Sequence, residues 1–134
     1  MVPPDQIASH PLNEQIAFLK HAGPKATYIC SVCGGAFQLA LAGLLEGKRA
    51  TTNKQFYRMI TAMAPGSITW VAKARWVVDG NVWTSSGVAA GGDMALAFLA
   101  HISSPEIARA IRGGIEIPEV TEEEDVFAKW HGLV

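Results

Sequence analysis

The hydrophobic pattern changes its period several times along the chain, and each change marks a predicted element. Apolar side chains recur at helical spacing in Pro11–His21, and the Gly-Pro pair that follows predicts the end of a surface helix. The β-prone segment Ala26–Cys30 predicts a buried strand, which a short turn connects to an apolar helix, Ala36–Glu46, closed by Gly47. Strand and helix patterns therefore alternate, which is typical of an α/β protein.

The alternation continues in the second half of the chain, where a β-hairpin gives the strongest local signal. Asp79-Gly80-Asn81 predicts a tight turn into the strand Val82–Ser85, because Asp-Gly and Gly-Asn tolerate positive φ. The flanking segments predict further strands and one more helix. The strands are expected at Arg49–Thr52, Ile68–Ala72 and Arg75–Val78, and the helix at Gln55–Ala64.

Two helices are predicted after the hairpin. The glycine-rich stretch Gly87–Gly92 is expected to be a loop that leads into the helix Asp93–Ile102, with the Asp93 carboxylate at its N-terminus. The next helix, Pro105–Arg112, is expected to have Ser104 as its N-cap and to end at a Gly-Gly pair. The acidic run Glu122–Asp125 is interpreted as a solvated tail.

Composition and charge narrow the class of protein. With 134 residues, 49% hydrophobic and 17% charged, residues 1–134 are expected to form a single domain with a core of its own. A net charge of −1 without a Lys/Arg cluster argues against a nucleic acid partner and against a membrane surface. The apolar stretches are too short to span a bilayer and no leader pattern opens the chain, so we expect a cytoplasmic location.

One constellation carries recognisable chemistry. A short strand, a turn with Cys33 at its apex, the small residues Gly34 and Gly35, and then a buried helix are the elements of a nucleophile elbow. The two glycines leave room for a substrate, and their N–H groups are candidate oxyanion donors. The positive end of the following helix favours a thiolate. The alternative is that Cys33 is a buried structural cysteine.

A second interpretation of the same segment is a redox centre. Cys30-Ser-Val-Cys33 has the C-x-x-C spacing of thioredoxin-like proteins. Two features weigh against this: Cys30 follows an apolar strand and is expected to point into the sheet, and Gly-Gly follows the pair where thioredoxin-like helices carry larger residues. Two cysteines are also too few for a disulfide framework.

The other candidate site residues lie at the predicted ends of strands. Thr52, Asn53, Ser86 and Gly87 are candidates for substrate binding, because α/β sheets bind ligands at the carboxyl ends of their strands. The four histidines lack metal-ligand spacing, so neither a metal nor another cofactor is expected. The Trp residues on extended segments are expected to pack in the core or a dimer interface, namely Trp70, Trp76 and Trp83.

Two blocks of sequence resemble a known family. The segment SVCGGAFQLALAGLLEGKRATTNK is similar to the Cys-centred elbow of the ThiJ/PfpI (DJ-type) superfamily, which has a class I glutamine amidotransferase-like fold. The segment ARWVVDGNVWTSSGVAAGGDMALAFLAHI resembles the family's second signature, and IARAIRGGIEI its closing helix. Within the superfamily, these segments most resemble the isonitrile hydratase branch. The resemblance covers most of Ala26–Ile117.

The resemblance implies a flavodoxin-like, mostly parallel sheet flanked by helices, usually in a homodimer. It also implies an enzyme for a small-molecule substrate, in which the elbow thiolate attacks an isonitrile carbon, an acidic residue shuttles protons and water releases an N-substituted formamide. Cys33 is the residue that carries over. The competing expectation is a catalytically impaired member that serves as a binding or structural subunit.

Three differences from the family pattern bear on activity. The family's N-terminal βαβ portion, which carries its acidic partner, is expected to be missing, so the domain is expected to be truncated. Val2-Pro3-Pro4 stands where relatives have an oxyanion-forming Pro-Gly-Gly, and proline has no N–H to donate. Gly34 stands where isonitrile hydratases commonly have a residue with a hydroxyl group, and Asn53 stands where many relatives have a histidine. A sheet without its first strands predicts a homodimer or a partner chain that completes it.

Overall fold

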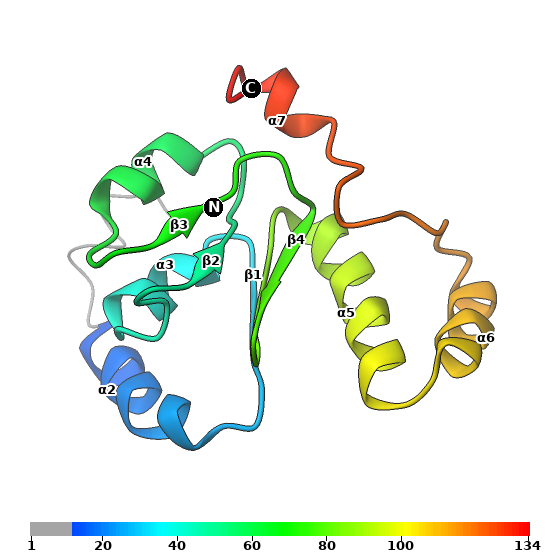
Figure 1. The fold of residues 1–134 in the computed structure, drawn as a ribbon, viewed down its shortest axis with the longest axis horizontal. Coiled ribbons are helices and arrows are strands. Elements are labelled where there is room, and N and C mark those ends of the chain that lie inside the picture. The colour runs from blue at the N-terminus through cyan, green and yellow to red at the C-terminus, as the bar shows by residue number, and fades with distance from the viewer. Residues whose placement is uncertain (1–11) are drawn as a thin grey trace.

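The computed structural model describes residues 12–134, in which helices and strands alternate as predicted (Figure 1). The first half contains α2 (Leu12–Ala22), the 3₁₀ turn η1 (Gly23–Lys25), β1 (Ile29–Val32), α3 (Gly35–Leu41), β2 (Arg49–Ala50) and α4 (Tyr57–Met63). The second half contains β3 (Thr69–Trp70), β4 (Trp76–Asp79), β5 (Val82–Ser85), α5 (Val88–Ile102), α6 (Pro105–Ile115) and α7 (Phe127–Trp130). The protein is thus of the predicted α/β class.

The three longest strands form one sheet in the order β1-β5-β4. β1 runs parallel to β5, with Ile29 opposite Val82 and Val32 opposite Ser85. β4 and β5 form an antiparallel hairpin, which confirms the predicted turn, and Gly80 has the positive φ of 59° that the turn needs. The short parallel pair β2 and β3 lies beside this sheet. β1 is therefore an edge strand within the described part of the chain.

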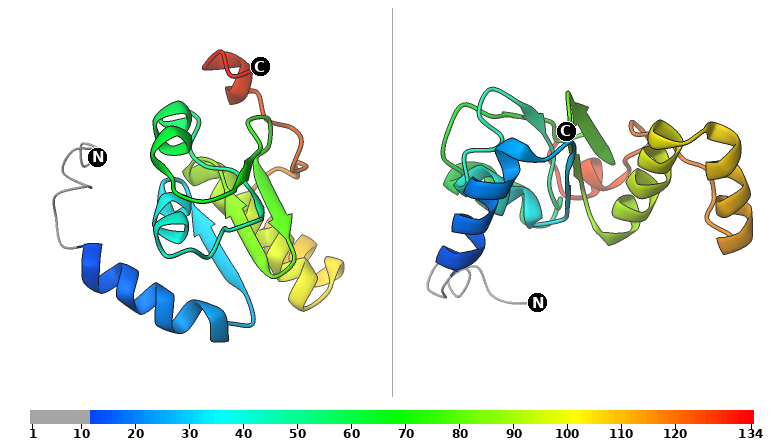
Figure 2. Two further views of the ribbon diagram at one scale, coloured as in Figure 1. Left: turned by 60° about the vertical axis from the view of Figure 1, so that its left-hand side comes forward. Right: turned by 90° about the horizontal axis from the view of Figure 1, so that it is seen from below.

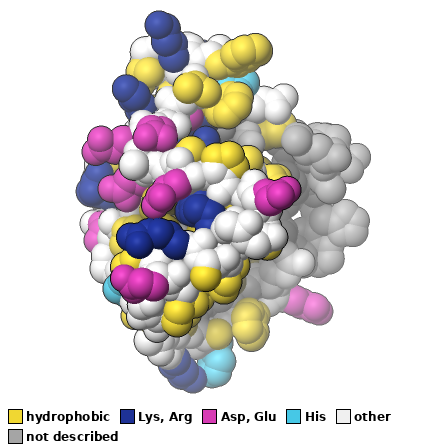
Figure 3. Space-filling model, turned by 90° about the vertical axis from the view of Figure 1, so that its right-hand side faces the viewer, with side chains coloured by type: hydrophobic (Ala, Val, Ile, Leu, Met, Phe, Trp, Pro, Cys, Tyr) yellow, Lys and Arg dark blue, Asp and Glu magenta, His cyan; other side chains and the backbone are white. Residues whose placement is uncertain are grey.

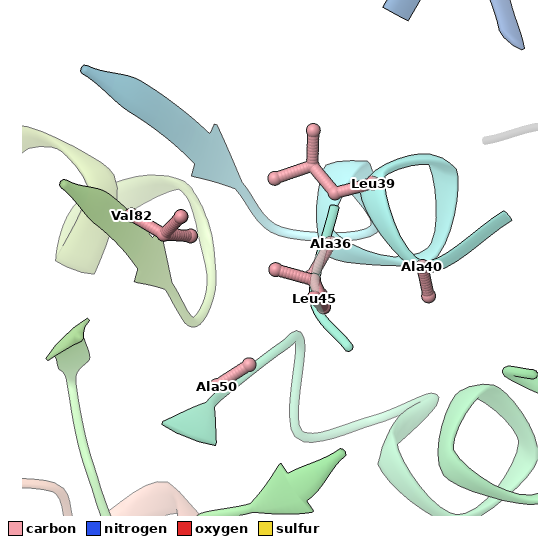
Figure 4. Close-up of a cluster of buried hydrophobic side chains, with 6 residues drawn as sticks. All are labelled: Ala36, Leu39, Ala40, Leu45, Ala50 and Val82. Carbon is pink, nitrogen blue, oxygen red and sulfur yellow. The ribbon is translucent and has the colours of Figure 1, made fainter. Parts of the chain in front are cut away.

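The sheet separates two hydrophobic clusters (Figures 1 and 2). Successive side chains of a strand point to opposite faces, so Val82 and Trp83 of β5 enter different clusters. Val82 packs with residues of α3, the turn after it and β2, as Figure 4 shows: Ala36, Leu39, Ala40, Leu45 and Ala50. Trp83 packs with Trp76 and Met94 beneath α5. The core role expected for Trp76 and Trp83 is confirmed, and the half-buried Trp70 packs against the Val82 cluster.

Several predicted boundaries were wrong, and tertiary contacts explain the shifts. β1 begins at Ile29 rather than at Ala26, because the ladder with β5 starts where Ile29 N–H donates to the Asn81 carbonyl. α3 ends at Leu41, because Gly43 takes a left-handed φ of 76° well before Gly47. α4 and the strands β2 and β3 are shorter than predicted.

The largest correction concerns the glycine-rich segment, which is helical. α5 begins at Val88, so Asp93 lies within the helix instead of at its N-terminus. The close approach of β1 explains the glycine at position 91, since a Cβ there would lie 2.6 Å from Val32 Cγ1. A residue without a side chain lets helix and strand pack closely.

α6 lies at the outside of the molecule against α5 (Figures 1 and 2). Its predicted cap is confirmed, because Ser104 Oγ accepts a hydrogen bond from the Ile107 N–H at 3.3 Å. The helix continues through the predicted Gly-Gly stop to Ile115, and Glu116 ends it with a φ of 55°. On the face that contains α6, apolar side chains are interspersed with charged ones (Figure 3). Within residues 12–134, no helix has the length and apolar character needed to cross a membrane.

Candidate functional site

The backbone at Cys33 has the geometry of a nucleophile elbow. Cys33 follows β1 directly, has a positive φ of 59°, and is followed by Gly34, the N-cap of α3. A left-handed conformation at a residue with a Cβ costs about 1 to 2 kcal/mol, and such strain collects at functional sites. The strain is held by neighbours on both sides. Cys33 N–H donates to the Ser85 carbonyl at 3.2 Å, and Thr52 Oγ1 donates to the Cys33 carbonyl at 2.8 Å.

The two residues after Cys33 keep their amide groups free of backbone partners. No backbone hydrogen bond from the N–H of Gly34 or Gly35 occurs among residues 12–134. A Cβ at Gly34 would meet no atom within 4 Å, so the space beside the elbow is open. This arrangement is compatible with the predicted oxyanion role of the two glycines. The Cys33 side chain is half-buried.

Cys30 differs from its expected position. Its side chain is exposed on the edge strand β1 and does not point into the sheet, so that part of the interpretation was wrong. Partial burial nevertheless raises the pKa of the Cys30 thiol. A thiol that is held protonated is a poor nucleophile for disulfide exchange, which weighs against a thioredoxin-like use of the C-x-x-C spacing.

A pocket of about 260 Å³ opens at the carboxyl ends of the strands. Three of the predicted binding residues lie in its wall, namely Asn53, Ser86 and Gly87. Thr52 does not, because it is fully buried and its hydroxyl is bonded to the backbone of Cys33. Cys33 is also outside the pocket lining. The structure therefore brings three of the predicted residues together in one pocket but leaves Cys33 out of its lining.

Two buried ion pairs border the pocket, and sequence reasoning missed both. Lys54 Nζ lies 3.5 Å from Asp125 Oδ2, with both side chains 2% exposed, and Lys54 also donates to Thr51 Oγ1 and the Ala74 carbonyl at 2.8 Å. Burial lowers the pKa of Lys54, and the Asp125 carboxylate only partly offsets this effect. Asp125 is thus not part of a solvated tail, and the expectation for Glu122–Asp125 was wrong at its last residue.

The second pair joins the hairpin to α5. Arg75 donates to Asp93 Oδ2 from both Nε, at 3.0 Å, and Nη2. Asp93 is 5% exposed, and its Oδ2 accepts two charge-assisted hydrogen bonds from one guanidinium in place of water. The only sequence signal for either pair is a charged residue beside apolar ones, which is also the pattern of many surface positions.

The C-terminal segment completes the wall of the pocket. Asp125, Phe127 and His131 all line it, and the segment is held by the hydrogen bond from Arg75 N–H to the Glu122 carbonyl at 2.6 Å. His131 is the C-cap of α7 and is half-buried. No group of three potential metal ligands occurs within residues 12–134. Val2-Pro3-Pro4 and His10 lie outside the described residues.

An α/β sheet with a strained cysteine between a parallel strand and a helix defines a class of proteins built around a nucleophile elbow. Comparison with known proteins identifies the family within that class. The model of the DJ-1/PfpI family matches residues 3–101, and the chain belongs to this family. Its structural neighbours share the flavodoxin-like fold expected from the sequence.

Individual relatives agree with this assignment. The chain is 34% identical over 103 residues to the isonitrile hydratase of Pseudomonas putida, a match that covers 77% of this chain and 43% of the relative. A ThiJ/PfpI family protein from Pseudomonas syringae superposes with a TM-score of 0.63 at 32% identity, covering 84% of this chain and 45% of that one. Drosophila melanogaster DJ-1beta gives a TM-score of 0.65 at 20% identity, covering 77% and 53%. The chain thus spans about half the length of these relatives or less.

Proposed function

We propose that the protein is a Cys-dependent enzyme for a small electrophile, with Cys33 as the nucleophile and isonitrile hydration as its reaction. The observation that carries this proposal is the φ of 59° at Cys33, a strained conformation fixed by hydrogen bonds on both sides of the residue. A structural cysteine has no need of this strain. Similarity to an isonitrile hydratase supports the choice of substrate.

The proposed reaction is an addition of water through a covalent intermediate. The Cys33 thiolate sulfur bonds to the isonitrile carbon, and that carbon takes up a proton, which gives an S-linked thioimidate. Water then adds across the C=N bond, and the C–S bond breaks with its electron pair returning to sulfur. The products are the N-substituted formamide and the regenerated thiolate, and the proton returns to solvent. The N–H groups of Gly34 and Gly35 would stabilise the oxygen of the tetrahedral intermediate.

Alkylation and turnover together test the role of Cys33. We expect iodoacetamide to modify Cys33 faster than Cys30, and a small alkyl isonitrile to yield its formamide, detected by mass spectrometry. Cys33→Ser should abolish both, whereas Cys30→Ser, the matched control, should retain them. Methylglyoxal serves as a second electrophile. No turnover of either compound by the intact thiol would refute the proposal.

The position of the pocket favours one alternative function, that of a binding subunit. Cys33 does not line the pocket, and the two cations that border it are each paired with a carboxylate. Ligand binding that is unchanged in Cys33→Ser, together with absence of turnover, would favour this alternative. A reversible Cys30–Cys33 disulfide, visible as a mass change on oxidation, would instead favour a redox role.

Self-association through β1 is part of the proposal. β1 pairs only with β5 within residues 12–134, so the N–H and C=O groups of Cys30 and Val32 that face away from β5 lie on the free edge. A second strand would satisfy them. Sedimentation velocity should give a dimer, and Val32→Lys should shift it towards a monomer, since a charge on an edge strand opposes pairing.

A further inference from the structure

The first turn of α5 opens into the pocket without a side-chain cap. Gly87 is the N-cap and supplies no side-chain hydrogen bond, and the first backbone bond of the helix runs from the Gly91 N–H to the Gly87 carbonyl. Val88, Ala89 and Ala90, which precede that bond, line the pocket. The N-terminus of this fifteen-residue helix therefore directs uncapped N–H groups and a partial positive charge towards the cavity.

A serine hydroxyl beside this turn is a further hydrogen-bond donor. Ser86 is 6% exposed and lines the same pocket, and among the hydrogen bonds of residues 12–134 none involves its Oγ. A ligand in the pocket could therefore accept a hydrogen bond from this hydroxyl. Asn53 adds a second donor nearby. Its Oδ1 accepts from the Phe56 N–H, while its Nδ2 lies 3.8 Å from the position of a Cβ on Gly87.

The charges around the pocket select the kind of acceptor. Lys54 is paired with Asp125, and Arg75 with Asp93, so the two cations are neutralised within the protein. Asp125 itself lines the pocket, and its Oδ1 accepts from the Phe127 N–H at 2.9 Å. With these cations paired, the partial positive charge of the helix N-terminus is balanced more closely by the single charge of a carboxylate than by a phosphate dianion.

Two apolar side chains also line the pocket, together with the polar Gln55 and His131. Val88 is 81% exposed and Phe127 is 49% exposed, so both present apolar surface that a ligand could cover. Phe127 belongs to the C-terminal segment, which lies beyond the residues that match the family.

We propose that the pocket is a binding site for a small carboxylic acid anion with an apolar substituent. The carboxylate accepts hydrogen bonds from the first-turn N–H groups of α5 and from Ser86, and the substituent packs against Val88 and Phe127. The site goes beyond the proposed reaction, because Cys33 does not contribute to it.

Benzoate is a suitable probe, with benzamide as its uncharged match. An amide chemical-shift titration of the Cys33→Ser protein should give saturable changes at residues 86–90 with benzoate and much smaller changes with benzamide. Since the thiol is absent, the result does not depend on whether Cys33 is a nucleophile. Changes that do not saturate, or equal responses to the two compounds, would overturn the proposal.

Substitution of Val88 by proline removes one backbone N–H donor from the site. Proline is tolerated at the first position of a helix, and Gly87, with φ −73° and ψ −177°, has the extended conformation required before proline. Val88→Pro should weaken benzoate binding about tenfold or more, since the lost hydrogen bond is to a charged group. Val88→Ala loses the same apolar side chain but keeps the N–H, so it is the control against which Val88→Pro is compared. Ser86→Ala should have a similar effect, and the exposed Ser67→Ala none. Unchanged affinity in Val88→Pro and Ser86→Ala would exclude the site.

Discussion

Thr52 and Cys33, which are nineteen positions apart in the sequence, are joined by a hydrogen bond from the Thr52 hydroxyl to the Cys33 carbonyl at 2.8 Å. Thr52 is fully buried, so no water competes for this bond. The bond fixes the peptide group that follows the strained residue and connects the elbow to the loop that carries Asn53 into the pocket. The orientation of the thiol therefore depends on a residue outside the elbow motif.

Removal of this hydroxyl should destabilise the protein. Thr52→Val keeps the shape of the side chain but leaves the Cys33 carbonyl without its partner, which should lower the free energy of unfolding by about 1 to 3 kcal/mol. Thr52→Ser keeps the hydroxyl donor and should lower the free energy of unfolding by less. Urea denaturation measures both variants. Equal stability of Thr52→Val and Thr52→Ser would mean that the hydrogen bond contributes nothing.

Alanine substitutions at two adjacent glycines of α5 should change the stability of the protein in opposite directions. A Cβ at Gly91 would lie 2.6 Å from Val32 Cγ1, so Gly91→Ala should cost about 1 to 3 kcal/mol through overpacking. A Cβ at Gly92 has its nearest neighbour, Ile117 Cδ1, at 4.0 Å, so Gly92→Ala should gain up to about 1 kcal/mol from helix propensity. Thermal or urea unfolding compares the two. Adding Val32→Ala to Gly91→Ala should restore part of the lost stability. If it does not, overpacking against Val32 is not the cause of the loss.

The Lys54–Asp125 pair should show strong coupling. Lys54→Met leaves the Asp125 carboxylate buried without a counter-charge and should lower the free energy of unfolding by about 3 to 5 kcal/mol. Adding Asp125→Asn removes the unpaired charge but keeps an acceptor for the Phe127 N–H. The double variant should therefore be more stable than Lys54→Met alone. A double-mutant cycle by urea denaturation measures the coupling, and additive effects would contradict it.

Tyr57 should make the protein sensitive to alkaline pH. Burial raises the pKa of Tyr57 from 10.0 to about 12, so the folded state keeps the proton that the unfolded chain releases. The stabilisation linked to this proton is fully present below about pH 10 and is lost as pH rises from 10 to 12, at about 1.4 kcal/mol per pH unit. Tyr57→Phe should remove this slope from the denaturation free energy. Tyr28→Phe, at a more exposed tyrosine, is the control, and a slope that survives Tyr57→Phe would assign it to another group.

The sequence by itself determined the features that depend on neighbouring residues. The Asp79-Gly80-Asn81 turn, the Ser104 cap and the position of Cys33 between a strand and a helix are local, since a few consecutive residues fix the backbone there. The family resemblance rests on the same local motifs and is confirmed. The predicted meeting of Asn53, Ser86 and Gly87 followed from a general property of α/β sheets, and these residues do share a pocket.

Only the tertiary structure decided which groups meet across the fold. The acidic run was predicted to be a solvated tail, but in the structure Asp125 pairs with Lys54, which lies seventy-one positions away. An ion pair between distant segments cannot be predicted from local composition. The glycines before Asp93 were predicted to form a loop, but they are part of α5. Packing of α5 against β1 outweighs the low helix propensity of glycine. Long-range contacts likewise placed Phe127 in the pocket lining and left Cys33 out of it.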